Sequence, residues 1–269
     1  MDAPLNSDQL DRYSRQLLLD SIDESAQRTL LSSRVLVVGA GGLGSAVLQY
    51  LTAAGVETIG IVDDGDVKRS NLQRQVVHTV DDVGEPKVDS AARFVEALNP
   101  DVTVEKHPEQ ANLETVESLV DGYDAVVDAL DNFRGRFVVN DAVRLAGLPF
   151  VHGAVYGFEG QTTTFVPDGP CYRCLLPEAP DEEAVPSDEP MGIFPTSPGT
   201  IGCLQATETI KYLVDVGNLL SGELLRYDGW DATFIRTPLE QQPDCPVCGS
   251  NAIESIDEVE YDDRCRIER

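Results

Sequence analysis

The chain has 269 residues, enough to bury one large core or one domain with a substantial appendage. Its 20 lysines and arginines against 47 aspartates and glutamates give a formal net charge of −27, which disfavours generic binding of nucleic acid. Neither a long apolar run nor a secretory signal pattern is present, so we expect a cytoplasmic protein that does not span a membrane.

The acidic excess extends over the whole chain, and lysine occurs at only four positions. This composition is typical of a halophilic surface, on which carboxylates hold hydration water and salt screens their mutual repulsion. A basic binding partner is the alternative interpretation. The even spread of the acids favours adaptation to salt.

The first predicted unit is a strand, a helix and a second strand around a glycine-rich turn. Residues 34–38 form a β-branched run that ends at Gly39-Ala40-Gly41-Gly42-Leu43-Gly44, and residues 42–54 have helical spacing. Residues 58–62 form the next strand and end at Asp63, 19 residues after the last glycine, where a ribose-binding carboxylate is expected. The pattern predicts a nucleotide site without distinguishing NAD from ATP.

Strands and helices continue to alternate as far as residue 156, which predicts an α/β fold with a doubly wound, Rossmann-like, mostly parallel sheet. After Gly157 the pattern favours antiparallel strands, one long helix at 199–216, and an exposed mobile loop at 178–190. We divide the chain into a helical arm for dimer contact (residues 1–30) and a nucleotide-binding half (31–156). A partner-binding half (157–249), which contains a crossover loop at about 175–198, and a loosely ordered acidic tail (250–269) follow. The other predicted strands are 102–105, 125–129, 149–155, 161–166, 224–227 and 232–237, and the other predicted helices are 86–98, 112–120 and 135–146.

A polar segment, Ser70 to Gln75, follows the glycine-rich unit and contains Asn71 and Arg74. Lys87 comes soon afterwards, and in a chain so poor in cations these two positive charges indicate a role. Enzymes that bind dinucleotides hold pyrophosphate mainly with backbone N–H groups. Added cations are instead suited to a reacting triphosphate. The segment therefore favours phosphate chemistry over an NAD-dependent dehydrogenase, which is kept as an alternative.

Asp131 directly follows the predicted strand at 125–129, so we expect it at the carboxyl edge of the sheet. A carboxylate there can hold Mg²⁺ against the phosphates of a nucleotide. The structural alternative is that Asp131 caps the helix that follows.

Six cysteines are present, and four of them form two C-x-x-C pairs separated by 70 residues. Four thiolates suit a closed tetrahedral zinc site with a structural role, whereas two unrelated pairs or a redox couple are the alternatives. Cys203 lies in an apolar helix and is interpreted as a core residue, and the role of Cys265 cannot be read. His78, His107 and His152 do not cluster in the sequence, and no catalytic histidine is expected. The predicted zinc ligands are Cys171, Cys174, Cys245 and Cys248.

Together these residues resemble the ubiquitin-activating enzyme superfamily, most closely its prokaryotic and archaeal branch of MoeB-, ThiF- and UbaA-like adenylyltransferases, in a form typical of haloarchaea. The resemblance covers roughly residues 10–249. Its motifs are Arg12-Tyr13-Ser14-Arg15-Gln16, Gly39 to Gly44, Ser70 to Gln75, Gly84-Glu85-Pro86-Lys87, Asp128-Ala129-Leu130-Asp131-Asn132, Pro198 to Ala206, and the four cysteines.

The resemblance implies adenylation of the C-terminal Gly-Gly carboxylate of a small ubiquitin-like modifier or sulfur-carrier protein, with ATP, Mg²⁺ and a structural Zn²⁺. It also implies a homodimer, because Arg15 would enter the partner subunit's site. The backbone at Gly41, Gly42 and Gly44 would lie beneath the nucleotide. The implied nucleotide-binding side chains are Asp63 for the ribose, Asn71, Arg74, Gln75 and Lys87 for the phosphates, and Asp131 with Asn132 for the magnesium end.

The chain departs from the family at two points. Many relatives carry a reactive cysteine in the crossover loop, where Asp188 stands here, and a carboxylate cannot carry a thioester or a persulfide. The segment Asp63-Asp64-Gly65-Asp66 also shifts one acid by a position. We therefore expect an enzyme that stops at the acyl-adenylate or passes it to an external sulfur donor. A non-catalytic binding subunit is the alternative. Cys203 or Cys265 could replace the missing thiol, although we expect no cysteine-linked conjugate.

Overall fold

The structure is a computed structural model that describes residues 4–180, 192–258, 260–262 and 264–268. Asp188 and the rest of the aligned segment 187–191 lie outside the described residues. None of the helices in the described ranges combines the length and hydropathy needed to cross a bilayer.

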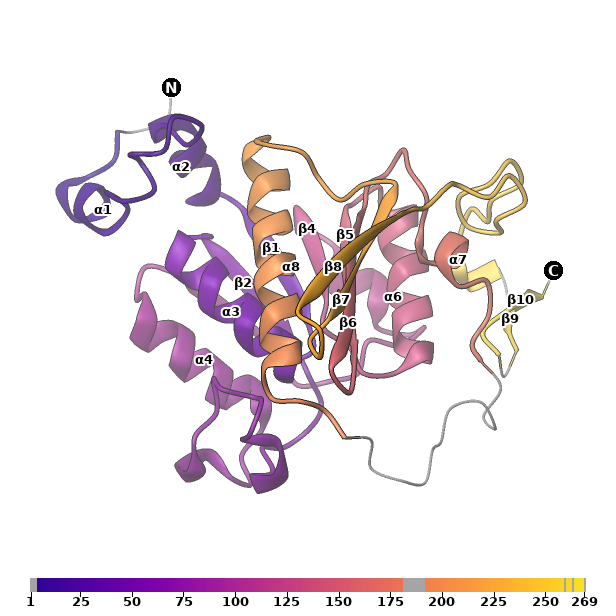
Figure 1. Cartoon of the computed structure of the whole chain (residues 1–269), viewed down its shortest axis with the longest axis horizontal. Helices are drawn as coiled ribbons and strands as arrows, with labels where there is room; N and C mark the ends of the chain where they lie inside the picture. The colour runs from indigo at the N-terminus through magenta and orange to yellow at the C-terminus, as the bar shows by residue number, and fades with distance from the viewer. Residues whose placement is uncertain (1–3, 181–191, 259, 263, 269) are drawn as a thin grey trace.

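One eight-stranded sheet organises the chain (Figure 1), and its strand order is β3-β2-β1-β4-β5-β6-β7-β8. The first five strands in this order are parallel, and the last three are added antiparallel. The predicted Rossmann-like sheet that continues into antiparallel strands is therefore confirmed. The strands are β1 (Arg34–Val38), β2 (Thr58–Val62), β3 (Thr103–His107), β4 (Ala125–Asp128), β5 (Phe150–Tyr156), β6 (Glu159–Phe165), β7 (Glu223–Asp228) and β8 (Thr233–Pro238), and a separate pair is formed by β9 (Glu260–Tyr261) and β10 (Ile267–Glu268).

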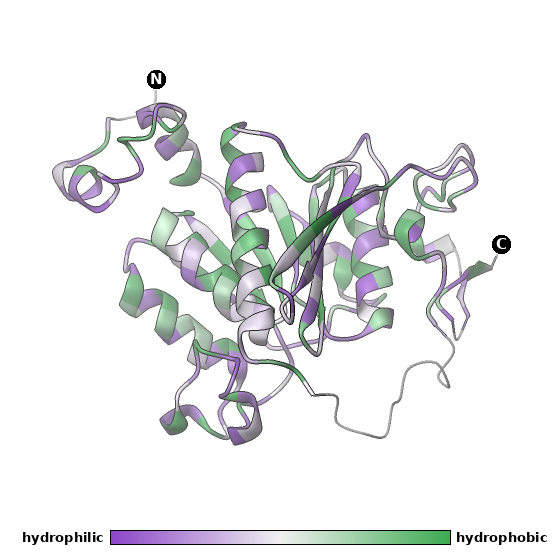
Figure 2. Ribbon diagram, viewed as in Figure 1, coloured by the Kyte–Doolittle hydropathy of each residue, from purple (hydrophilic) through white to green (hydrophobic). Residues whose placement is uncertain are grey.

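Helices cover both faces of the sheet because the central strands are apolar on both sides. In β1, Leu36 and Val38 belong to one buried cluster, while Val35 and Val37 belong to another, as alternating side chains require. The first cluster includes α5, α6 and α7, and the second includes α3, α4 and α8. Figure 2 shows hydrophobic residues concentrated in these inner strands. The helices are α1 (Ser7–Arg12), α2 (Glu24–Leu30), α3 (Gly42–Ala54), α4 (Lys87–Leu98), α5 (Val116–Val120), α6 (Phe133–Leu145), α7 (Tyr172–Leu175) and α8 (Thr196–Val214).

The glycine turn and the end of β4 approach each other closely. Gly39 has φ +108°, and a Cβ atom there would lie 2.4 Å from the carbonyl oxygen of Ala129. This position therefore requires glycine both for its backbone conformation and for the contact. The strand order reverses between β1 and β4, so the contact lies at the crevice where open α/β sheets bind ligands.

Helix α8 packs directly against α3, the helix that begins at the glycine turn. A Cβ atom on Gly202 would lie 2.5 Å from the carbonyl oxygen of Leu43 and 2.8 Å from the Cβ of Ala46. Because Gly202 has no side chain, the two helix backbones can come together. The long helix predicted at 199–216 is present, three residues earlier at its start and two residues shorter at its end.

Two sequence-based expectations are wrong. The predicted helix 112–120 begins only at Val116, because the Asn112 side chain accepts hydrogen bonds from the backbone N–H groups of Glu114 and Thr115. The tail is not loosely ordered where it is described: Ile256 and Cys265 are buried, and β9 and β10 pair. The apolar tail residues that pack against the core were hidden among many acids in the sequence.

The close contact between the two helices can be tested with two substitutions on α8. Gly202→Ala should lower the free energy of unfolding by about 1–3 kcal/mol because its methyl group collides with α3. Gly199→Ala, whose Cβ would meet no atom within 4 Å, should raise it by up to about 1 kcal/mol through helix propensity. Urea unfolding measures both changes, and equal effects of the two substitutions would contradict the packing described.

Candidate nucleotide and zinc sites

Asp63 joins the end of β2 to the glycine turn. One carboxylate oxygen accepts a hydrogen bond from the backbone N–H of Ala40 at 2.9 Å, and the other accepts one from Gly65 at 2.8 Å. The carboxylate is thus fixed at the carboxyl edge of the sheet, in the crevice defined by the strand order. This is the position that the sequence predicts for a ribose-binding acid.

Lys87 is the first residue of α4, and its Nζ lies 3.3 Å from both Asp63 carboxylate oxygens. The two side chains are only 17% and 10% exposed, so they attract each other with little screening by water. The structure therefore brings together two residues that the sequence assigned to the ribose and to the phosphates. The ribose and a phosphate of one nucleotide are close enough to each other to contact Asp63 and Lys87 at the same time.

The polar segment Ser70 to Gln75 folds over the glycine turn. A Cβ atom on Gly42 would lie 3.4 Å from the Cγ of Arg74, and one on Gly41 would lie 3.5 Å from the Nε2 of Gln75. Gln75 is buried, and its side-chain oxygen has no hydrogen-bond partner among the described residues. A buried amide oxygen without a partner is costly, and a polar ligand at the turn would satisfy it.

Asn71 shapes this segment through its backbone. It ends a short 3₁₀ turn, Arg69–Asn71, and its carbonyl oxygen accepts hydrogen bonds from the backbone N–H groups of Arg74 and Gln75. The compact turn directs Arg74 and Gln75 towards the glycines. Asn71 is half-buried beside them.

His78 supports the turn from below, and sequence reasoning missed it. Its Nε2 lies 2.9 Å from the carbonyl oxygen of Ala40, and its Nδ1 lies 2.8 Å from the hydroxyl of Ser90. Burial lowers the pKa of His78, which keeps the ring neutral. An isolated histidine gives no sequence signal for such a role, because both partners come from distant parts of the chain.

Asp131 and Asn132 follow the end of β4. The Asn132 side chain accepts a hydrogen bond from the Gly135 N–H at 2.7 Å and caps α6, so the alternative that Asp131 is the cap is wrong. Asp131 is exposed and lies two residues beyond Ala129, which contacts the glycine turn. Its carboxylate is thus available to a ligand at the same edge of the sheet.

Arg15 lies far from this edge within its own chain. It is exposed in the turn after α1, and the neighbouring Tyr13 packs against Gly55 at the end of α3. The glycine turn lies at the opposite end of this 13-residue helix, about 20 Å away at 1.5 Å per residue. The structure does not bring Arg15 to the other predicted site residues of the same subunit.

The four predicted zinc ligands converge on one point. Their sulfur atoms all lie within 4.8 Å of one another, and the closest pairs are Cys171 with Cys245 at 3.6 Å and Cys174 with Cys248 at 3.3 Å. Zinc–sulfur bonds of about 2.3 Å in a tetrahedron place sulfurs roughly 3.8 Å apart. The thiols therefore fit a closed Zn²⁺ site, and the alternative of two unrelated pairs is wrong.

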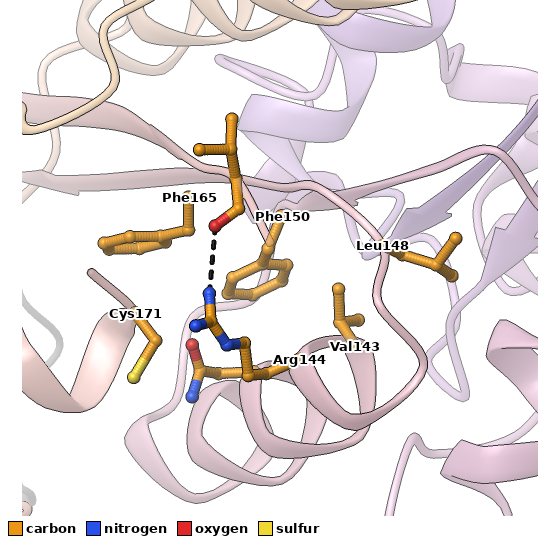
Figure 3. A pocket seen from close by; sticks show the side chains of 8 residues that line it. Val143, Arg144, Leu148, Phe150, Phe165 and Cys171 are labelled. Atoms are coloured by element: carbon orange, nitrogen blue, oxygen red, sulfur yellow. Dashed lines mark hydrogen bonds between the residues drawn. The ribbon is translucent and has the colours of Figure 1, made fainter. Parts of the chain in front are cut away.

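The cavity beside Cys171 is distinct from the carboxyl edge of the sheet at the glycine turn (Figure 3). It is lined by apolar groups, including Val143 and Phe150, and the side chain of Arg144 crosses it to donate to the backbone oxygen of Val166. Its volume of about 10 Å³ leaves room for about one water molecule. It cannot hold a nucleotide.

The two remaining cysteines are partly or fully shielded from solvent. Burial raises the pKa of Cys203, which is half-buried on α8. Burial also raises the pKa of Cys265, which is packed in the tail. A thiol with a raised pKa is less often in the reactive thiolate form.

Comparison with known proteins gives consistent results. A SAMP-activating enzyme E1 of Haloferax volcanii is 54% identical over 99% of this chain and 99% of its own length. A sulfur carrier protein adenylyltransferase of Thermus thermophilus is 45% identical over 96% of this chain and 97% of its own length. The crystal structure of Escherichia coli MccB with AMPCPP and MccA has the same fold, with a TM-score of 0.82 at 23% identity over 91% of this chain and 76% of that one.

The model of the ThiF family matches residues 13–247, which include the glycine turn, the polar segment over it, Asp131 and three of the four clustered cysteines, and end one residue before the fourth, Cys248. By this match and the two relatives, the chain belongs to the ThiF family.

Proposed function

We propose that this protein uses ATP and Mg²⁺ to adenylate the C-terminal Gly-Gly carboxylate of a small ubiquitin-like modifier or sulfur-carrier protein. The observation that carries the proposal is the group formed by Lys87, Asp63 and the unpaired Gln75 at the glycine turn. The names of the Haloferax and Thermus relatives support the same class of reaction.

In the proposed step, a carboxylate oxygen of the partner attacks the α-phosphorus of ATP. The bond between that phosphorus and the oxygen bridging to the β-phosphorus breaks, and pyrophosphate leaves with the bonding electrons. Both reactants are anionic, so their repulsion has to be reduced and their approach fixed. Arg74 and Lys87 supply positive charge for this purpose, while bound Mg²⁺, held by Asp131, would neutralise phosphate charge.

The antiparallel end of the sheet offers a surface for the protein partner. Strand β8 is exposed along its whole length and forms the edge of the sheet, and among the described strands only β7 pairs with it. Ile235 on β8 and nearby Trp230 are 62% and 76% exposed. An exposed edge with large apolar side chains supports docking of a small folded protein in the predicted partner-binding half.

The N-terminal arm supports the proposed homodimer. Leu18 and Leu19 are 73% and 53% exposed on the arm, which stands away from the sheet (Figure 1). Apolar side chains in such a position favour contact with another protein surface. The distance of Arg15 from the glycine turn of its own chain supports action at the partner subunit's site.

The proposed reaction ends at the acyl-adenylate or its transfer to an external sulfur donor. Cys203 is half-buried and Cys265 is buried, which supports the absence of an accessible replacement thiol.

Exchange of labelled pyrophosphate into ATP, in the presence of Gly-Gly-ending proteins from the same genome, tests the adenylation step. Asp131→Ala and Arg74→Ala should each lower the rate by roughly 100-fold or more, because each removes charge stabilisation from the transition state. Lys106→Ala removes an exposed cation from β3 and should leave the rate unchanged. Absence of exchange by the wild-type protein at both low and high salt would refute adenylation. Nucleotide binding without turnover would instead favour a binding subunit.

Mixed dimers test whether Arg15 acts across the subunit interface. Arg15→Ala and Asp131→Ala should each be inactive alone. When co-expressed, they should recover about a quarter of the wild-type exchange rate, because half of randomly paired dimers are mixed and each mixed dimer has one complete site. If the mixture stays inactive while mixed dimers are demonstrably formed, Arg15 does not act in trans.

Metal analysis tests the zinc site. The wild-type protein should contain one Zn²⁺ per chain, and Cys245→Ser should lose the metal and unfold at a lower temperature, because metal binding is coupled to folding. Cys203→Ser provides the control and should keep the zinc. A wild-type protein that lacks zinc when purified from zinc-containing medium would contradict the assignment.

A further inference from the structure

A buried ion pair lies directly beneath the turn that carries Asp131. The Nε of Arg136, on α6, donates to a carboxylate oxygen of Asp128, the last residue of β4, at 2.7 Å. The Asp128 side chain is fully buried, and that of Arg136 is 7% exposed.

The same two side chains hold both polar backbone groups of Leu130. The Leu130 N–H donates to the second carboxylate oxygen of Asp128 at 3.1 Å, and the Nη2 of Arg136 donates to the Leu130 carbonyl oxygen at 2.6 Å. Leu130 immediately precedes Asp131. With both peptide groups of Leu130 fixed, the backbone has little freedom to change the direction in which Asp131 leaves the turn.

Further contacts hold Asp128 itself in place. The Nδ1 of His152 lies 2.7 Å from the same oxygen that faces Arg136, and the Nε2 of Gln205 donates to the Asp128 carbonyl oxygen at 2.7 Å. Burial would raise the pKa of Asp128, but the charge of Arg136 and the bond with His152 outweigh it and hold the pKa below its ordinary value. Burial lowers the pKa of His152, which stays neutral, so the cluster carries one positive and one negative charge.

A contribution to the free energy of folding is a poor explanation for the buried pair of Arg136 and Asp128. Taking two charges out of water is costly, and a buried ion pair can often be replaced by apolar side chains without loss of stability. A lysine could pair with Asp128, but it lacks the planar fork with which Arg136 reaches Asp128 and Leu130 together. Arg136 therefore fixes the backbone of the turn at Leu130 in addition to pairing with Asp128.

We infer that Arg136 and Asp128 are positioning residues that aim the Asp131 carboxylate at the metal and phosphates of the bound nucleotide. This inference rests on the proposed function, because it assumes that Asp131 holds Mg²⁺. Neither residue touches the ligand in this role. Both act through the Leu130 backbone, as the groups that orient metal ligands commonly do.

Arg173 provides a matched control on the zinc side of the molecule. It is also buried, pairs with a buried aspartate, Asp141, and donates to a backbone oxygen, that of Cys265, at 2.6 Å. Arg136→Lys and Arg173→Lys therefore remove the same kind of fork from two buried pairs. Both should lower the thermal midpoint, but only Arg136→Lys changes the turn at Asp131.

The probe is α,β-methylene-ATP, in which a methylene group replaces the oxygen between the α- and β-phosphorus atoms. The proposed reaction cannot break this linkage, so binding is measured without turnover. Calorimetry gives its affinity with and without Mg²⁺. For Arg136→Lys, the Mg²⁺ concentration that half-saturates binding should rise roughly 10- to 100-fold, with the Mg²⁺-free affinity unchanged. Arg173→Lys should match the wild type in both. If Arg136→Lys also matches the wild type, while Asp131→Ala loses the Mg²⁺ dependence, the positioning role is wrong and the metal role of Asp131 stands. If the wild-type protein shows no Mg²⁺-dependent binding, the proposed function itself fails.

Amide hydrogen exchange in the wild-type protein tests the inference without any substitution, so misfolding of a variant cannot affect the result. The Leu130 N–H, bonded to Asp128, should exchange slowly by NMR in the nucleotide-free protein. Fast exchange at Leu130 would show that the turn is not held and would overturn the inference. In folded Arg136→Lys, the Leu130 amide should exchange faster than in Arg173→Lys.

Discussion

The carboxyl edge of the sheet, where we propose that the nucleotide binds, depends on the absence of a side chain at Gly39. Because a Cβ atom there would lie 2.4 Å from the carbonyl oxygen of Ala129, the glycine turn and the end of β4 can meet only with glycine at this position. The contact places the start of α3 beside the turn that carries Asp131. Asp63 completes the edge from the other side by accepting the Ala40 N–H. Three strand ends are thus joined over a short distance.

Much of this edge could be predicted from the sequence because its signals are local. β-Branched runs, a glycine pattern and an acid after the second strand each reflect the geometry of a few consecutive residues, so strands β1 and β2 and helix α3 match their predicted bounds. The four clustered cysteines could also be predicted from local signals, because two short C-x-x-C motifs contain all of them. The Asp131 turn could be placed because it follows a strand directly.

The supporting residues could not be predicted, because their partners come from distant parts of the chain. His78 reaches Ala40, Arg136 reaches back to Asp128 and Leu130, and Gln205 bridges β4 and β5 from α8. An arginine on a helix or a lone histidine gives no sequence signal for such contacts. Composition was also misleading for the tail, where a few buried side chains that pack against the core lie among many acids in the sequence. These side chains are Ile253, Ile256 and Cys265.

Helix α6 links the two sites. Its first turns carry Asn132, which caps the helix beside Asp131, and Arg136, while Asn140 further along accepts a hydrogen bond from the backbone N–H of Tyr172 at 2.8 Å. Tyr172 lies between the zinc ligands Cys171 and Cys174, and its ring centre is 5.7 Å from the Arg136 guanidinium and 5.0 Å from that of His152. The bond from Tyr172 to Asn140 therefore ties the loop that carries two of the four clustered cysteines to the ion pair beneath Asp131. A metal held by these cysteines would stabilise the packing of Tyr172 on that ion pair, in addition to joining the tail to the core.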